Sequence, residues 1–381
     1  MELTQDEIFR YSRHLIIPQV GLEGQRKLKS ASVLLIGSGG LGSPISLYLA
    51  AAGVGHIGVV DYDSVESSNL QRQVIHDTQH LGMPKAESAR DRMLAVNPFI
   101  QVDPIVENFT TENAIEISTG YDILVDGTDN FPTRYLINDL CVMTGRPYVY
   151  GSIFRFEGQI SVFDARTGPC YRCLFPDPPE PGLIPSCAEG GVFGVLPGTV
   201  GTIQATEVIK LILGTGEPLV GKLLLYDALE MSFQTVQLRK NPHCVICGDT
   251  PSITKLIDYE EFCGTSSNIH HDKNQVGWDI EVRELEKRLR LGEKFRLIDV
   301  RDPVEQQVSM LEGAESIPLE KLSAHMSEFS QDENIVFFCR TGSRSLRALK
   351  MFRKAGFRNV KNLQGGLNTW AQMVDKSMFQ Y

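Results

Sequence analysis

The sequence has no long hydrophobic run, little cysteine and no excess of basic residues. None of its apolar stretches approaches the roughly 18 residues that a membrane-spanning helix requires, so we expect no membrane partner. The formal net charge of −10 argues against nucleic acid or an anionic membrane surface as a general partner. The opening stretch MELTQDEIFR is acidic and lacks the apolar core of a secretory signal, so we expect a cytoplasmic protein.

Cysteine is also too scarce for a disulfide scaffold, because the chain holds only eight in 381 residues. Four of the eight fall in two Cys-x-x-Cys pairs, which favours metal or redox use in a reducing compartment. Hydrophobic content of 42% and charged content of 22% are ordinary for a globular protein. A chain of this length is expected to form two domains.

The first part of the chain alternates short apolar runs with helical stretches. A buried strand at 33–36 leads through GSGGLG into a helix at 44–53, and a second strand follows at 57–61. This order is that of a βαβ unit. The alternation continues to about residue 250 with helices at 85–96 and 133–144. It predicts an α/β, Rossmann-like domain with a mainly parallel sheet over residues 1–250.

A break in the rhythm separates this domain from a second one. Residues 251–275 are assigned to a linker because their second half, GTSSNIHHDKNQ, is polar and rich in turn formers. A smaller α/β domain is expected over 276–381, with a helix at 279–291 and a strand at 334–339 followed by a helix at 345–355.

The GSGGLG stretch matches the pattern G-x-G-x-x-G through Gly37, Gly39 and Gly42, with Gly40 between them. Such glycines let the backbone approach a phosphate group at the start of a helix. Asp61 ends the next strand, where a carboxylate can bind ribose hydroxyls. Taken alone, these residues fit a dinucleotide-binding oxidoreductase as well as an ATP-binding enzyme.

Charged residues after the glycines favour ATP. Arg72 and Lys85 together suit a triphosphate, which carries more charge than the pyrophosphate of a dinucleotide. Asp129 follows a strand at the edge where such sheets bind ligands, and its carboxylate suits Mg²⁺. A hydride-transfer enzyme needs none of these three residues.

Several motifs together resemble the MoeB/ThiF family of ubiquitin-activating-type enzymes. They are YSRHLIIPQVG, GSGGLGSP, VDYDSVESSNLQRQ, GMPKAESAR and DGTDNFPTRYLIND, within residues 1 to about 262. The resemblance implies adenylation of the C-terminal glycine of a small ubiquitin-fold sulfur-carrier protein. It implies a homodimer in which Arg13 reaches a neighbour's phosphates. The residues expected to contact ATP and Mg²⁺ are Gly37, Gly39, Gly40, Gly42, Asp61, Ser68, Asn69, Leu70, Gln71, Arg72, Gln73, Lys85, Asp129 and Asn130.

The two Cys-x-x-Cys pairs are Cys170 with Cys173 and Cys244 with Cys247. Four thiolates in a tetrahedral array form a structural zinc site, and both pairs stand beside turn residues. Such a site has no open coordination position, so we expect it to stabilise the fold and not to catalyse. The alternative is two unrelated pairs.

Three further cysteines of the first part carry different expectations. Cys187 lies in IPSCAEGGVFG, a stretch rich in proline and glycine that is typical of a mobile loop. Some members of the MoeB/ThiF family use a cysteine at this position for a covalent link to the carrier, so a catalytic role is expected for Cys187. Cys141 and Cys263 are interpreted as packing or surface residues.

Cys339 ends the apolar run NIVFF and precedes Arg340, Thr341, Gly342, Ser343 and Arg344, and a helix follows. Loop amides and the helix N-terminus favour an anion there, and two arginines add positive charge. These effects lower the pKa of a thiol and favour the nucleophilic thiolate. Phosphatase loops have Cys-x₅-Arg, whereas this one is a residue shorter, which suits a single sulfur carried as a persulfide.

The second domain resembles a rhodanese domain through LIDVRDPVEQQ, GAESIPL, CRTGSRS and LQGGLNTW. The usual Gly-His before the GA turn is replaced by VSMLEGA. The resemblance implies that Cys339 carries a persulfide in a cradle formed by Arg340, Thr341, Gly342, Ser343 and Arg344, which we call the persulfide cradle.

The stretch from Arg340 to Lys361 holds eight basic residues and no acidic one. It is either a solvated surface or a docking surface for an acidic partner, namely the carrier or the acidic first domain. Residues 276–381 contain 17 basic and 15 acidic residues, so the remaining chain has a net charge of −12. Attraction of this sign speeds encounter more than it tightens binding.

The sequence therefore predicts an ATP-, Mg²⁺- and zinc-dependent adenylyltransferase and sulfurtransferase. Its partners would be the carrier and a sulfur donor, either a cysteine desulfurase or thiosulfate. Molybdopterin, thiamine, cysteine and tRNA-thiolation pathways all use similar carriers. Two alternatives remain: a nucleotide-dependent oxidoreductase with a phosphatase-like domain, and a non-catalytic scaffold that binds nucleotide and carrier.

Overall fold

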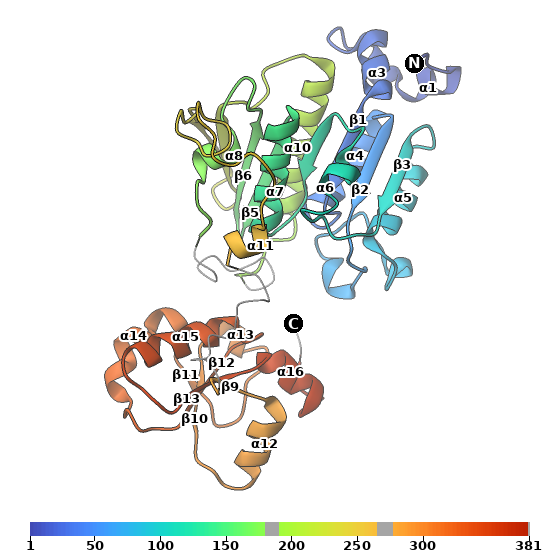
Figure 1. Cartoon of the computed structure of the whole chain (residues 1–381). Helices are drawn as coiled ribbons and strands as arrows, with labels where there is room; N and C mark the ends of the chain where they lie inside the picture. Colours follow the sequence, from blue (N-terminus) through green and yellow to red (C-terminus); the bar gives the residue numbers. More distant parts are fainter. Residues whose placement is uncertain (180–189, 265–276, 380–381) are drawn as a thin grey trace. The chain divides into compact units, whose positions relative to one another are not determined.

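The computed structural model describes residues 1–179, 190–264 and 277–379. These residues form two compact units (Figure 1), the first containing residues 1–179 and 190–264 and the second residues 277–379. In the part of the chain that the structure describes, no helix combines the length and apolar character needed to cross a membrane.

An eight-stranded sheet forms the centre of the first unit, in the order β3-β2-β1-β4-β5-β6-β7-β8. The first five strands of this order are parallel, whereas β6, β7 and β8 continue it as antiparallel strands. This confirms the α/β fold with a mainly parallel sheet. The strands are β1 (Ser32–Ile36), β2 (His56–Val60), β3 (Gln101–Ile105), β4 (Ile123–Asp126), β5 (Tyr148–Phe154), β6 (Glu157–Phe163), β7 (Lys222–Asp227) and β8 (Ser232–Gln237).

Helices cover both faces of this sheet, because alternate residues of β1 enter different cores. Val33 and Leu35 pack with one set of helices, α3 (Gly21–Ser30), α4 (Gly42–Ala52), α5 (Lys85–Val96) and α10 (Leu196–Leu213). Leu34 and Ile36 pack with the other set, α6 (Ala114–Ser118), α7 (Phe131–Thr144), α8 (Tyr171–Leu174) and α11 (Tyr259–Phe262). The N-terminal arm adds α1 (Gln5–Arg10) and α2 (Ser12–Leu15).

Helix boundaries follow the local signals in the sequence. Helix α4 ends at Gly53, whose φ of 83° is a left-handed conformation that glycine adopts without strain. Gly214 ends α10 in the same way, with φ 67°. Helix α5 ends at Asn97, directly before a proline. The ends of α4 and α5 agree with the helices expected at 44–53 and 85–96 to within one residue.

The first half of the expected linker packs against the first unit. Tyr259 and Cys263 are buried in the core beneath α7. The Tyr259 hydroxyl donates to Asp139 at 3.0 Å, and the Thr111 hydroxyl donates to the Ile257 carbonyl at 2.9 Å. Residues 251–264 therefore belong to the first unit, because they bury aromatic side chains there. The remainder of the expected linker, 265–275, lies outside the described residues.

The second unit is built on a five-stranded parallel sheet in the order β11-β10-β12-β13-β9. Its two cores place α14 and α15 on one face and α12 and α16 on the other. The expected helix at 279–291 begins instead as strand β9, because residues 279–280 pair with β13. The elements are β9 (Asp279–Ile280), α12 (Val282–Arg290), β10 (Arg296–Asp299), α13 (Pro303–Gln306), β11 (Glu315–Ser316), α14 (Leu322–His325), β12 (Ile335–Phe338), α15 (Ser343–Lys354), β13 (Val360–Leu363) and α16 (Gly366–Met373).

Candidate functional site

The glycine-rich loop joins β1 to α4 at the carboxyl edge of the parallel strands. Gly37 has φ 91°, and a Cβ there would come within 2.8 Å of the Gly127 backbone. A Cβ on Gly42 would overlap the carbonyl oxygen of Gly37. The loop is therefore packed against the turn after β4, and these two positions require glycine. Backbone amides at the start of α4 can face an anion here.

Asp61 anchors the glycine-rich loop from the end of β2. One of its carboxylate oxygens accepts hydrogen bonds from the Ser38 amide at 2.8 Å and the Ser38 hydroxyl at 3.0 Å. Its other oxygen accepts from the Asp63 amide at 3.0 Å. Asp61 thus contributes to the loop's conformation as well as offering a carboxylate to a ligand.

Lys85 opens α5 and is buried, with its amine 2.8 Å from the carboxylate of Asp63. The pKa of Tyr62 is raised chiefly by the charge of Asp63, then by burial and by the charges of Asp61 and Asp129. Tyr62 therefore lies within electrostatic reach of Asp61, Asp63, Lys85 and Asp129, and binding of ATP or Mg²⁺ by these residues stays a prediction. Asp63 is an addition that the sequence reasoning missed, although it stands only two residues after Asp61.

Residues 67–73 lie against the glycine-rich loop. A Cβ on Gly39 would lie 3.5 Å from the Gln73 side chain, and one on Gly40 would lie 3.8 Å from the Arg72 side chain. The Arg72 guanidinium donates to the Ser68 carbonyl at 3.2 Å. Asn69 and Gln73 are buried, whereas the other expected contacts of this segment are more accessible, namely Ser68, Leu70, Gln71 and Arg72.

Asp129 lies in the turn after β4 and is exposed, whereas Asp126, at the end of β4, is buried. Asp126 is fully buried, so its pKa is raised by burial, although Arg134 lies 3.4 Å away and opposes this. The amide and hydroxyl of Thr128 donate to Asp126 at 2.8 and 2.7 Å. The expected ligand residue Asn130 serves as the N-cap of α7, because its side chain accepts from the Thr133 amide at 2.9 Å.

Arg13 lies on α2, and its side chain is exposed. In the sequence it precedes the glycine-rich loop by more than 20 residues. Large apolar side chains around it on the N-terminal arm are also exposed: Phe9 to 85% and Ile16 to 72%. An arm that exposes this much apolar surface is a typical protein contact surface.

The four cysteines of the two Cys-x-x-Cys pairs meet, with all four sulfur atoms within 4.8 Å of one another. The sulfur of Cys173 also accepts a hydrogen bond from the Asn241 amide at 3.4 Å. Four thiolates this close together would repel one another, so they need a cation between them. This cluster can hold a metal ion, and its donor set suits zinc.

A buried ion pair fixes the first cysteine pair to the rest of the unit. Arg172 stands between Cys170 and Cys173 in the sequence. Its guanidinium donates to both carboxylate oxygens of Asp139 at 2.8 Å. The same guanidinium lies over the rings of Tyr135 and Phe262, at 4.7 and 4.5 Å from their centroids. The cysteine cluster is therefore tied to α7 and to the segment that ends the first unit.

Cys339 follows β12 and is buried, with 1% of its surface exposed. Its sulfur accepts hydrogen bonds from the Gly342 amide at 3.1 Å and the Ser345 hydroxyl at 3.5 Å. Gly342 has φ 100° and precedes the first residue of α15, as expected for a loop that turns its amides inward. A Cβ on Gly366 would come within 2.6 Å of the Arg340 carbonyl oxygen, so the Gly-Gly turn before α16 packs on the cradle.

Arg344 forms a bidentate ion pair with Glu305, at 2.6 and 2.7 Å. Burial would raise the pKa of Glu305, but the hydrogen bonds from Arg344 outweigh it and lower that pKa. The sequence argument counted Arg344 as positive charge acting on the thiol, whereas the structure balances this charge with a carboxylate. The partner was missed because Glu305 is 39 residues away.

A buried arginine also binds the VSMLEGA stretch, where the chain departs from the rhodanese pattern. Arg301 is fully buried and donates to Asp299 at 2.6 Å and to the Ser309 carbonyl at 2.7 Å. It therefore connects β10 to the VSMLEGA stretch. Leu311 of that stretch is buried in the core between the sheet and α12.

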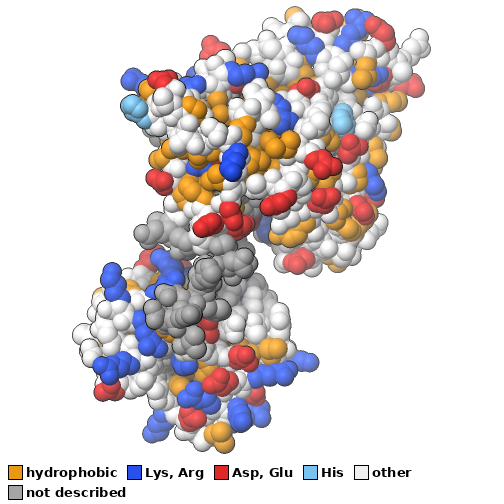
Figure 2. Space-filling view, viewed as in Figure 1, with side chains coloured by type: hydrophobic (Ala, Val, Ile, Leu, Met, Phe, Trp, Pro, Cys, Tyr) orange, Lys and Arg blue, Asp and Glu red, His pale blue; other side chains and the backbone are white. Residues whose placement is uncertain are grey.

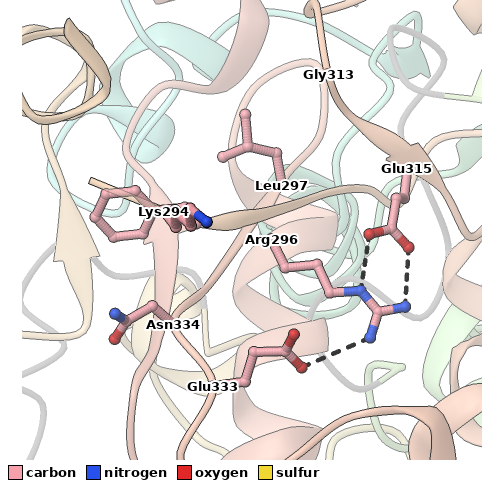
Figure 3. A pocket seen from close by; sticks show the side chains of 8 residues that line it. Lys294, Arg296, Leu297, Gly313, Glu315, Glu333 and Asn334 are labelled. Carbon is pink, nitrogen blue, oxygen red and sulfur yellow. Dashed lines mark hydrogen bonds and ion pairs between the residues drawn. The ribbon is translucent and has the colours of Figure 1, made fainter. Parts of the chain in front are cut away.

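A separate pocket lies in the second unit and is lined by residues at the start of β10 and β12 (Figure 3). Cys339 follows the other end of β12. The Arg296 guanidinium in this pocket is bound by Glu315 at 2.8 and 2.9 Å, and it lies 3.6 Å from Glu333 (Figure 3). This pocket lies at the opposite end of β12 from Cys339, so it is separate from the persulfide cradle.

The remaining cysteines divide as follows. Cys141 and Cys263 are buried in the first unit, and burial raises the pKa of each to about 12. Both are packing residues. Cys187 lies outside the described residues.

The comparisons with known proteins identify the two halves of the chain. Residues 11–246 match the ThiF family, and residues 281–373 match the rhodanese-like domain. The chain belongs to the ThiF family. It carries a rhodanese-like domain after the ThiF region, and it is an enzyme of the adenylyltransferase and sulfurtransferase class.

Relatives of the ThiF family match over the full chain or over the first unit. The probable adenylyltransferase/sulfurtransferase MoeZ of Mycobacterium tuberculosis is 50% identical over 100% of this chain and 96% of its own length. The adenylyltransferase and sulfurtransferase MOCS3 of Culex quinquefasciatus is 43% identical over 98% of this chain and 90% of its own. The sulfur carrier protein adenylyltransferase of Thermus thermophilus is 55% identical over 69% of this chain and 99% of its own.

Solved structures of the enzyme MccB from E. coli share the fold of the first unit. The complex of MccB with ATP has a TM-score of 0.56 and 26% identity, over 63% of this chain and 75% of that one. The complex of MccB with N-formylated MccA has a TM-score of 0.57 and 26% identity over the same shares. The names of the relatives above, and not these structures, favour an adenylating enzyme over the oxidoreductase and scaffold alternatives.

Proposed function

We propose that this enzyme adenylates the C-terminal glycine of a small ubiquitin-fold sulfur-carrier protein and then converts it to a thiocarboxylate. The observation that carries the proposal is that one chain combines two sites: a glycine-rich loop near Arg72, Lys85 and Asp129, and a buried cysteine whose sulfur accepts hydrogen bonds from the Gly342 amide and the Ser345 hydroxyl. Either site alone would leave an unfinished reaction, because an acyl adenylate needs a nucleophile and a persulfide needs an activated acceptor.

In the first step the carrier's carboxylate attacks the α-phosphate of ATP, and pyrophosphate leaves. ATP would lie on the glycine-rich loop, with Arg72 and Lys85 at its phosphates and Asp61 at its ribose. Mg²⁺ would supply charge neutralisation, and Asp129 would hold it because an exposed carboxylate is a suitable ligand for this cation. The protein then needs no nucleophile of its own for this step, only positioning and charge.

The ion pair of Lys85 with Asp63 supports this assignment. Lys85 is buried, and the carboxylate of Asp63, 2.8 Å away, compensates its charge. A triphosphate entering the site would offer Lys85 a stronger anionic partner. Asp63 would thus keep Lys85 oriented at the site before the nucleotide arrives.

In the second step a persulfide on Cys339 attacks the acyl carbon of the adenylate, and AMP leaves. The product is an acyl disulfide between the carrier and Cys339. Attack of the Cys187 thiolate on the Cys339 sulfur would release the carrier thiocarboxylate and leave a disulfide between the two cysteines. A dithiol reductant of the cytoplasm would then reduce that disulfide. A cysteine desulfurase or thiosulfate would reload Cys339 with sulfur.

Zinc is proposed as the resident ion of the cysteine cluster, with a structural role. The four sulfur atoms already converge, and no other ligand is needed to complete a tetrahedral site. The test is the metal content of the purified protein: we expect one zinc ion per chain, lost in Cys244→Ser. Full zinc content in that variant would contradict the assignment.

A homodimer is proposed through the N-terminal arm. Association would cover the exposed apolar side chains of Phe9 and Ile16 and would bring Arg13 to the phosphates bound by the neighbouring protomer. Phe9→Ser should therefore weaken both dimer formation and adenylation. A monomeric variant with full adenylation would contradict this role of Arg13.

The basic stretch from Arg340 to Lys361 supports docking of an acidic partner. Arg347, Lys350 and Lys354 are exposed at helical spacing along α15, which begins at the cysteine cradle. Lys and Arg side chains recur on the surface of the second unit (Figure 2). We expect added salt to slow sulfur transfer and to leave adenylation nearly unchanged. Equal slowing of both reactions would argue for a solvated surface only.

The experiment that tests the proposed function is ATP–pyrophosphate exchange in the presence of a panel of small ubiquitin-fold proteins. We expect exchange to depend on one of them, and intact-mass analysis to show replacement of a carboxylate oxygen by sulfur in that carrier. Cys339→Ala should keep the exchange and lose the sulfur. Absence of exchange with every carrier would refute the proposal, even if the protein transferred sulfur from thiosulfate.

A further inference from the structure

His76 is buried beside the glycine-rich loop, and both nitrogen atoms of its ring are engaged. Its Nε2 lies 3.1 Å from the carbonyl oxygen of Ser38. Its Nδ1 lies 2.9 Å from the hydroxyl oxygen of Ser88. Ser38 is the second residue of the GSGGLG loop, and Ser88 is on α5, one turn after Lys85.

The chemistry of these partners fixes the protonation of the ring. A carbonyl oxygen only accepts hydrogen bonds, so Nε2 carries a proton and donates it to Ser38. In the neutral ring Nδ1 is then an acceptor, and the Ser88 hydroxyl donates to it. Burial lowers the pKa of His76, which favours this neutral form.

The contact completes a set of three hydrogen bonds around Ser38. Asp61, at the end of β2, accepts from the amide and the hydroxyl of Ser38. His76, just after residues 67–73, donates to the Ser38 carbonyl. The Ser38 carbonyl and the Gly39 amide belong to the same peptide group. Its orientation therefore sets where that amide points.

The segment of His76 also carries the phosphate-side residues. The Arg72 amide donates to the Asn69 carbonyl at 3.1 Å, and the His76 amide donates to the Gln73 carbonyl at 3.1 Å, so two successive turns lead from Asn69 to His76. Through Ser88 the ring also contacts α5, which carries Lys85. One side chain thus joins the glycine-rich loop, the Arg72 segment and the Lys85 helix.

The geometry points to His76 as a positioning residue for adenylation, which holds these three elements in register for ATP. It does not touch the substrate itself. The inference rests on the proposed binding of ATP at the glycine-rich loop. Small displacements of groups that position a reactant have large effects on rate, so losing the Ser38 contact should weaken ATP binding and slow adenylation.

A pair of amide variants separates the two hydrogen bonds. Glutamine places its amide nitrogen at the same number of bonds from Cα as histidine Nε2, so His76→Gln can still donate to Ser38. Asparagine matches only Nδ1, so His76→Asn keeps a partner for Ser88 and leaves the Ser38 carbonyl without its donor. Both variants lose one hydrogen bond, and a purely structural role would therefore affect them equally.

The readouts are ATP affinity by titration calorimetry and carrier-dependent ATP–pyrophosphate exchange. We expect His76→Asn to weaken ATP binding and lower kcat/KM for ATP by about tenfold or more, and His76→Gln to stay within about threefold of the wild type. Sulfur transfer from thiosulfate to cyanide by the second unit of the same chain should be unchanged in both. Equal effects of the two variants, or no effect of either, would overturn the inference.

Two controls complete the test. His80 lies four residues further along the same segment and bonds Asp77 at 2.7 Å, away from the loop, so His80→Asn should leave ATP affinity unchanged. Ser88→Ala should weaken ATP binding in the wild type and have no added effect in His76→Gln, because glutamine does not need Ser88. This cycle replaces His76→Asn if that variant does not fold. Calorimetry needs no carrier, so its result stands even if no carrier supports exchange.

Discussion

Replacement of Arg172 by methionine should destabilise the first unit and leave the second unit unchanged. The Arg172 and Asp139 side chains are 1% and 0% exposed, and their ion pair is bidentate at 2.8 Å. Methionine fills part of the volume but leaves the Asp139 carboxylate buried without a cation. Removing one partner of such a pair costs about 3–5 kcal/mol. The stacking of the guanidinium on Tyr135 and Phe262 is lost as well.

The two units can be followed separately because both tryptophans, Trp278 and Trp370, belong to the second unit. Tryptophan fluorescence during urea unfolding therefore reports the second unit, whereas circular dichroism reports both. In Arg172→Met we expect the transition of the first unit to move down by about 1 M urea. The fluorescence transition should not move.

A surface pair provides the matched control. Arg26 binds Glu2 at 2.9 Å, with 38% and 83% of the two side chains exposed, so Arg26→Met should cost less than about 1 kcal/mol. Adding Asp139→Asn to Arg172→Met removes the unpaired charge and should restore part of the loss. The reasoning is refuted if Arg172→Met costs no more than Arg26→Met, or if the second substitution destabilises further.

Three other predictions concern single groups. Cys339→Ala should abolish thiocarboxylate formation, seen by intact mass, while exchange of pyrophosphate stays within about twofold of the wild type. Arg344 lowers the pKa of Glu305 in the folded protein below its ordinary value of 4.5. The ion pair therefore stabilises the second unit fully at a pH above 4.5, and this stabilisation is lost as the pH falls through the folded pKa. Glu305→Gln should therefore flatten the acid side of the stability profile measured by tryptophan fluorescence, and an unchanged profile would contradict the pair's role. Cys141 and Cys263, with pKa values raised to about 12 by burial, should resist alkylation at pH 8 in the native protein and react after unfolding, as peptide mapping would show.

Local patterns in the sequence predict much of this structure. The GSGGLG loop, the helix that ends at Gly53 and the helix that ends before Pro98 are all set by residues next to one another. The α/β class follows from the alternation of such segments. The meeting of four cysteines was predictable for a different reason, because two close pairs of soft ligands have few other uses.

The residues that the sequence did not predict act through distant partners. Tyr259 stood in a stretch that resembled a linker, yet its hydroxyl reaches Asp139, 120 residues away. His76 reaches Ser38 across 38 residues, and no spacing rule relates the two. Asp126 is buried beneath the turn that carries Asp129, where its carboxylate accepts hydrogen bonds from Thr128 and from the distant Tyr148. In each case the partner is determined by the tertiary fold.

The cradle of Cys339 shows how charge counting can mislead. Two arginines near a thiol suggest a strongly positive loop, but Glu305 neutralises Arg344 with both carboxylate oxygens. The Gly342 amide, 3.1 Å from the sulfur, and the N-terminus of α15 are then the groups that favour an anionic sulfur. Such dipoles suit a singly charged persulfide better than a phosphate dianion, which needs a free guanidinium for bidentate binding. The proposal of a persulfide in this loop therefore rests as much on the carboxylate beside it as on the loop's own length.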